Sequence, residues 1–73
     1  MKRYSMREMK MMVRAGVAKD ITRASFETAN ELDLEQIGYC AGTCGIVGAV
    51  FQSRKDNELY VVTARNSLLF RLA

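Results

Sequence analysis

Two apolar runs in the second half of the chain give the clearest hydrophobic pattern. The first, Gly45 to Gln52, carries no charge, and the second, Leu59 to Ala64, is rich in β-branched and aromatic residues, which fit a pleated surface. The segment between them is polar throughout and contains Asp56-Asn57, a pair that tolerates the left-handed backbone of a turn. The pattern therefore predicts an antiparallel hairpin.

Further apolar segments on both sides extend this hairpin. Upstream, Ile37 to Ala41 fits a strand that leads into the glycines before the hairpin. Downstream, Arg65-Asn66-Ser67 fits a short turn, and residues 68–72 then alternate as a strand does. Together these runs predict a three- to four-stranded antiparallel meander over about residues 37–72.

The predicted strands place apolar side chains on both faces of the sheet. Adjacent pairs such as Ile46-Val47 and Val61-Val62 depart from the apolar–polar alternation of a sheet with one wet face. One helix can cover one face only, so the second face needs either the middle segment of the chain or a partner. For a domain of this size, we favour a partner, and we expect a homo-oligomer, with a dimer preferred.

Two helices are predicted before the sheet. Ser5 followed by Glu8 fits a capping box, and Gly16 is a natural stop, so we expect an amphipathic helix over about residues 5–15. Ser25 is a plausible N-cap for a short second helix over about residues 25–33. Residues 17–24 fit either a helix extension or an edge strand. The predicted fold class is α+β.

The charge distribution is uneven along a chain of 73 residues, which is enough for one small domain, 1–73. Residues 1–23 hold seven Lys/Arg and two acids, net +5, whereas residues 24–36 hold four acids and no base, net −4. The remainder, 37–73, holds four bases and two acids, which brings the total to +3. The basic front can attract a polyanion or pair with the acidic middle.

No membrane span or signal sequence is expected. The longest uncharged run, Ile37 to Ser53, is shorter than the roughly 20 apolar residues of a spanning helix, and no apolar segment follows the basic N-terminus. We therefore expect a cytoplasmic protein of bacterial or phage type.

The basic residues of the first helix recur at helical spacing, which puts them on a single stripe. The candidate contacts for an anion or nucleic acid are Arg3, Arg7, Lys10 and Arg14. One interpretation is a solvated face that keeps a small protein soluble and can also pair with the acids of the middle segment. Another is a phosphate-contacting helix. A third, an anionic membrane surface, lacks Trp and Phe on the apolar side.

The sequence contains little material for catalysis. It has no histidine, which removes the commonest general base and metal ligand. Cys40 and Cys44 are the only cysteines, and their three-residue separation is not that of thioredoxin-like or zinc motifs. They are candidates for a redox pair or for plain structural thiols. Gly42 to Gly45 lacks the Lys-Ser/Thr ending of a phosphate-binding loop. We predict no enzyme, cofactor or metal.

One further cluster is a candidate protein interface. Its residues are Tyr60, Val62, Arg65 and Asn66. Turn chemistry alone explains Arg65 and Asn66, whereas a recognition role would make Arg65 an interface anchor. The sequence thus suggests a small non-enzymatic interaction or regulatory protein that self-associates and binds a protein partner. The alternatives are a nucleic-acid-binding accessory protein using the basic helix, and a cysteine-dependent redox protein.

Overall fold

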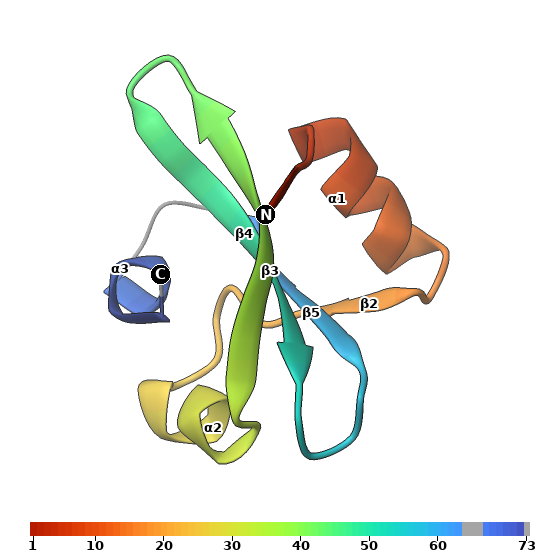
Figure 1. Ribbon diagram of the computed structural model, residues 1–73, viewed down its shortest axis with the longest axis vertical. Helices are drawn as coiled ribbons and strands as arrows, with labels where there is room; N and C mark the ends of the chain where they lie inside the picture. The colour runs from red at the N-terminus through yellow and green to blue at the C-terminus, as the bar shows by residue number, and fades with distance from the viewer. Residues whose placement is uncertain (64–66, 73) are drawn as a thin grey trace.

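The computed structural model describes residues 1–63 and 67–72, which fold as a five-stranded sheet with helices on both faces (Figure 1). In chain order the elements are β1 (Lys2–Arg3), α1 (Met6–Arg14), β2 (Ala18–Asp20), α2 (Phe26–Glu31), β3 (Leu34–Gly42), β4 (Gly45–Ser53), β5 (Leu59–Val62) and α3 (Ser67–Leu72). The strands lie in the order β1-β3-β4-β5-β2. The α+β class is confirmed.

The centre of the sheet is the antiparallel set β3-β4-β5. The predicted hairpin is formed by β4 and β5, with Ala49 opposite Val62. Its turn uses Asn57 in the left-handed region, at φ 59°. A second hairpin joins β3 to β4, where Gly42 pairs with Gly45 and Gly45 has a φ of 110°, a conformation that glycine adopts without strain. The strand predicted at 37–41 is therefore present and longer.

The two edges of the sheet differ from the prediction. β1 pairs in parallel with β3, with Lys2 opposite Gly38, and β2 pairs in parallel with β5, with Ala18 opposite Leu59. The sheet is consequently mixed, and the prediction of a purely antiparallel meander was wrong. Within residues 17–24, the structure forms an edge strand over Ala18–Asp20 and no extension of the helix.

The C-terminal segment is a helix, so the strand predicted at residues 68–72 was wrong. Leu68 and Leu69 are adjacent in α3, and they are only 4% and 2% exposed. In a strand the two side chains would point to opposite faces, whereas on a helix they share one broad apolar side. The turn residues Arg65 and Asn66 lie outside the described residues.

Local sequence signals define both ends of α1. The capping box is formed, with the Glu8 backbone N–H donating to Ser5 Oγ at 3.0 Å and the Ser5 N–H donating to Glu8 Oε1 at 3.1 Å. At the other end Gly16 takes a φ of +77°, and its N–H and that of the next residue donate to carbonyls of the last turn, as in a Schellman motif. The helix predicted over residues 5–15 is confirmed.

The second predicted helix is confirmed in a shorter form. Ser25 caps α2 by accepting from the Thr28 backbone N–H at 3.2 Å. The fully buried Ser53 hydroxyl donates to the Leu32 carbonyl at the end of α2 and accepts from the Lys55 backbone N–H at 3.0 Å. This hydroxyl joins the end of α2 to the β4–β5 turn.

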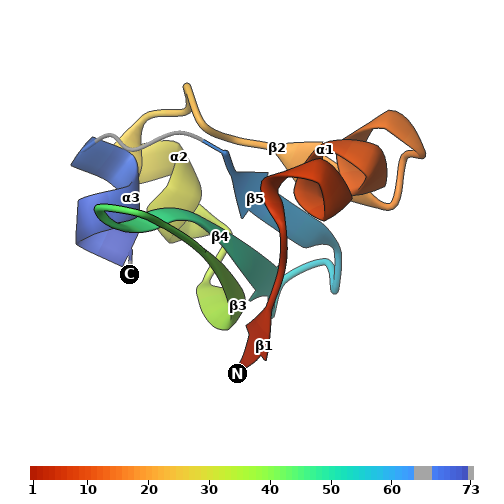
Figure 2. The ribbon, with the colours of Figure 1, turned by 90° about the horizontal axis from the view of Figure 1, so that it is seen from above.

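The helices cover opposite faces of the sheet, as Figures 1 and 2 show. One core lies under α1 and is built from Met9, Ala18, Cys40, Val50 and Val61. The other lies under α2 and α3 and is built from Ala29, Ala49, Phe51, Tyr60, Val62, Leu68 and Leu69. The second face is therefore covered by the chain itself. That face consequently needs no partner to cover it.

Candidate functional site

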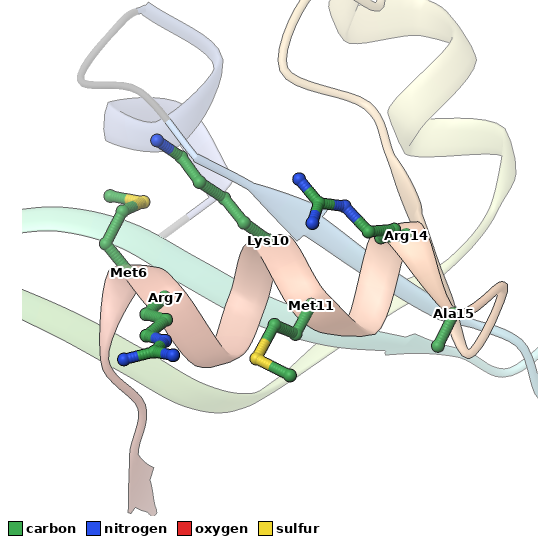
Figure 3. Close-up of a pocket in the computed structure, with 6 residues that line it drawn as sticks. All are labelled: Met6, Arg7, Lys10, Met11, Arg14 and Ala15. Carbon is green, nitrogen blue, oxygen red and sulfur yellow. The ribbon is translucent and has the colours of Figure 1, made fainter.

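The outer face of α1 carries three of the four cations of the predicted basic stripe, whereas the fourth, Arg3, lies in β1. Met9 is fully buried against the sheet, and this contact fixes which side of the helix faces outward. Arg7, Lys10 and Arg14 are exposed on that outward side. In Figure 3, Lys10 and Arg14 lie along one side of the helix and Arg7 along the other. The structure thus brings together three of the four sequence-predicted cations on one helix surface.

Between these side chains lies an open hollow of about 680 Å³, which we call the basic groove. Its lining residues are Met6, Arg7, Lys10, Met11, Arg14 and Ala15. They form two rows at four-residue spacing, which is the spacing of neighbouring ridges on a helix. Met11 is 57% exposed in the middle of the cations. The groove therefore combines positive charge with an accessible thioether side chain.

No acid of the described residues forms an ion pair with a cation of the basic groove. Within residues 1–63 and 67–72, the ion pairs join Arg54 to Asp33 at 3.4 Å and to Glu35 at 3.7 Å. Both pairs belong to the acidic middle segment, whose helix α2 lies on the face of the sheet opposite α1 (Figure 2). In that same described part, Arg7, Lys10 and Arg14 form no ion pair. The only acid on α1, Glu8, is engaged in the capping box.

Arg3 lies at a second hollow, of about 490 Å³, which we call the hairpin hollow. This hollow lies between the start of α1 and the β3–β4 hairpin, and Met6 lines both it and the basic groove. Tyr4 lines it too, with Lys2 Nζ 4.8 Å from the ring centroid. The basic surface thus continues from the groove to Arg3.

The candidate interface residues of the sheet are differently placed. Tyr60 and Val62 are buried in the core under α2 and α3, so neither offers a surface to a partner in this fold. The Tyr60 hydroxyl donates to Asp56 Oδ2 at 2.7 Å. This hydrogen bond raises the pKa of Tyr60 to about 12 and is the main reason that the pKa of Asp56 lies below its ordinary value.

The two cysteines lie on different parts of the β3–β4 hairpin. Cys40 is buried in β3, and Cys44 is exposed in the turn between β3 and β4. Among the described residues, no three His, Cys, Asp or Glu side chains are grouped so that they could hold a metal ion.

Two features of the structure were missed by reasoning from the sequence. The hairpin hollow depends on Tyr4, Cys40 and Val47, which are distant in sequence and meet only through tertiary packing. A third hollow, of about 450 Å³, is lined by Asp20, Thr22, Arg23 and Thr63. There the Thr22 N–H donates to Asp20 Oδ1 at 2.8 Å and the Thr63 N–H donates to Thr22 Oγ1 at 2.9 Å. The Asp-x-Thr spacing of an Asx turn was the available signal for this cluster.

None of the helices formed by the described residues is long and apolar enough to cross a membrane. Comparisons with protein-family models, with curated proteins and with solved structures found no match to this chain.

Proposed function

We propose that the protein is a small, non-enzymatic, cytoplasmic accessory protein that binds nucleic acid through the basic groove of α1. The observation that carries this proposal is the separation of charge across the sheet. Arg7, Lys10 and Arg14 face outward and form no ion pair within residues 1–63 and 67–72, while Asp33 and Glu35 are engaged with Arg54. The ion pairs of the described residues give no support to pairing of the acidic segment with these cations.

The chemistry of the groove suits a phosphate backbone. Arg and Lys side chains that replace condensed counterions bind nucleic acid without reading its sequence. Clustering of cations along one helix in a chain with an isoelectric point near 9.1 is the electrostatic pattern of such proteins. Three contacts on one short helix support modest, strongly salt-dependent affinity.

A second candidate function is binding of a protein partner, including a second copy of this chain. Met11 favours it, because a 57% exposed methionine among cations offers an adaptable apolar contact that a phosphate backbone does not use. A partner of this kind would present acidic residues around an apolar patch. Self-association would likewise use α1, since both faces of the sheet are covered.

The first prediction tests the groove by charge neutralisation. A variant with Arg7→Gln, Lys10→Gln and Arg14→Gln keeps good helix formers on α1 while removing three charges. Fluorescence anisotropy with labelled DNA and RNA at about 50 and 200 mM salt should show weak binding by this variant, with a salt slope smaller by about three. The wild-type protein should bind more tightly at the lower salt concentration.

The matched control removes the same number of charges elsewhere. Lys19→Gln, Arg23→Gln and Lys55→Gln alter exposed cations outside the basic groove. This control should bind almost as the wild type does. Equal losses of affinity in both variants would show that binding depends on net charge and not on the basic groove. Absence of wild-type binding at low salt would refute the proposed function. In that case a Met11→Ser variant and the mass of the protein in solution would test the protein-partner alternative.

A further inference from the structure

The hairpin hollow lies beside the basic groove and shares the lining residue Met6 with it. It is formed where the first turn of α1 lies beside the β3–β4 hairpin, and Met6 separates it from the groove while lining both. Arg3 stands at its rim and Arg7 at the groove beyond Met6. A ligand whose anionic part followed α1 would therefore have this hollow beside it.

The lining of the hairpin hollow is apolar below and polar at the rim. Cys40 is only 5% exposed, and the side chains of Tyr4, Met6 and Val47 are partly buried. At the rim, the polar groups of Ser5 and Glu8 are already joined in the capping box. Arg3 is exposed there, and within the described residues it forms no ion pair. An apolar hollow with a few polar groups at its edge suits a flat, mostly uncharged ligand group.

A nucleobase has this character, with an apolar face and a polar edge, and it is attached to the phosphate that the groove attracts. Bases of a single strand are available to stack on aromatic and apolar side chains. A base within a duplex reaches such a hollow only after it is unpaired and unstacked, at an energetic cost. A site that combined this hollow with the groove would therefore favour a single strand over a duplex.

We propose that the protein binds single-stranded nucleic acid, with backbone phosphates along the basic groove and one unstacked base in the hairpin hollow. This inference rests on the proposed function and adds to it the class of ligand. The hairpin hollow contributes to affinity by contacting the base, and this contribution is independent of charge.

The experiment compares three ligands of the same length, about 12 nucleotides, which lies within the range of single-strand site sizes. They are a fluorescein-labelled DNA strand, the same strand annealed to its complement, and the same strand with its bases replaced by abasic sites. The wild-type protein should bind the intact strand about tenfold more tightly than either of the others, because stacking of one base contributes an effect of this order. The abasic strand carries the same phosphates, so it isolates the contribution of the base.

Variants locate this contribution in the hollow. Val47→Phe should fill the hollow and lower affinity for the intact strand to that of the abasic strand, while salt sensitivity stays unchanged. Ile46→Phe is the matched control, because Ile46 is adjacent, 40% exposed and not part of the lining. Ala41→Leu, at a second lining position, provides the same test if Val47→Phe fails to fold.

The outcomes separate this inference from the proposed function. Salt-sensitive binding that is equal for the strand, the duplex and the abasic strand would refute the occupied hollow and leave the basic groove as the binding surface. A preference for the duplex would also refute it. Absence of wild-type binding to all three ligands at low salt would refute both proposals together.

Discussion

At the residue scale, Gly48 determines how closely α1 lies on the sheet. A Cβ atom at this position would stand 2.8 Å from the Val62 carbonyl oxygen and 2.9 Å from Met9 Cε. Met9 can adjust, but a backbone oxygen within a paired strand cannot move without disturbing the sheet. Gly48→Ala should therefore lower the free energy of unfolding by about 2 kcal/mol, as measured by urea denaturation.

Gly42 provides the comparison for that substitution. A Cβ atom there would meet only Val47 side-chain atoms, the nearest at 3.1 Å, and a carbonyl oxygen at an ordinary 3.8 Å. Gly42→Ala should therefore cost clearly less than Gly48→Ala. Equal stability of the two variants would show that β4 can shift away from α1, against the packing described.

The Tyr60–Asp56 hydrogen bond predicts a specific dependence of stability on pH. The pKa of Tyr60 is raised from 10.0 to about 12, chiefly by this hydrogen bond. The fold thus favours the protonated phenol, and its stabilising contribution is complete below pH 10.0 and is lost as the pH rises through about 12. The stability difference between the wild type and Tyr60→Phe should shrink over this interval, as followed by urea denaturation.

Asp56 gives the acid counterpart of the same interaction. Its pKa is lowered from 3.8, so its contribution to stability is present above that value and disappears as the pH falls through the lowered pKa.

Absorbance of the Tyr60 phenolate provides a direct check of the raised pKa, since the difference between wild-type and Tyr60→Phe titrations should have its midpoint near 12. A midpoint at 10.0, the ordinary value, would show that the hydrogen bond does not persist in solution.

At the element scale, α1 and the β4–β5 hairpin could be predicted because their signals are local. The capping box of Ser5 and Glu8, the left-handed Gly16 and the polar turn around Asn57 each act within a few residues. The basic groove followed from the same information, since helical spacing alone places Arg7, Lys10 and Arg14 together. The hairpin hollow could not be predicted, because it exists only where α1 meets the β3–β4 hairpin.

The misassigned C-terminal segment shows where local pattern becomes ambiguous. Leu68, Leu69 and Leu72 fit one side of a helix, while Leu68, Phe70 and Leu72 fit one side of a strand, and six residues are too few to separate the two periods. Burial of both Leu68 and Leu69 against the core under α2 decides for the helix. The edge strands β1 and β2 are only two and three residues long. Segments this short show no hydrophobic pattern from which their parallel pairing could be predicted.

At the scale of the whole molecule, the chain crosses from one face of the sheet to the other. This crossing places the cations of α1 and the acids of α2 on opposite faces. α1 carries its cations outward on one face, and the segment that follows β2 takes Glu27 and Glu31 to the opposite face with α2. The same crossing covers the second face with α2 and α3, which removes the reason to expect a dimer through the sheet. The outer face of α1 consequently carries three cations that form no ion pair among the described residues.

The two cores meet across β5, and this arrangement predicts that the domain unfolds as one unit. Val61 belongs to the core under α1 and Val62 to the core under α2 and α3, and both are 0% exposed. Val61→Ala and Val62→Ala should each lower the free energy of unfolding by about 2 kcal/mol, with one transition seen by both circular dichroism and tyrosine fluorescence. Ile46→Ala, at an exposed position of β4, should cost less than about 1 kcal/mol. A strand shared by both cores should couple their unfolding. Separate transitions for the two signals in either valine variant would therefore contradict this arrangement and would mean that each face folds independently.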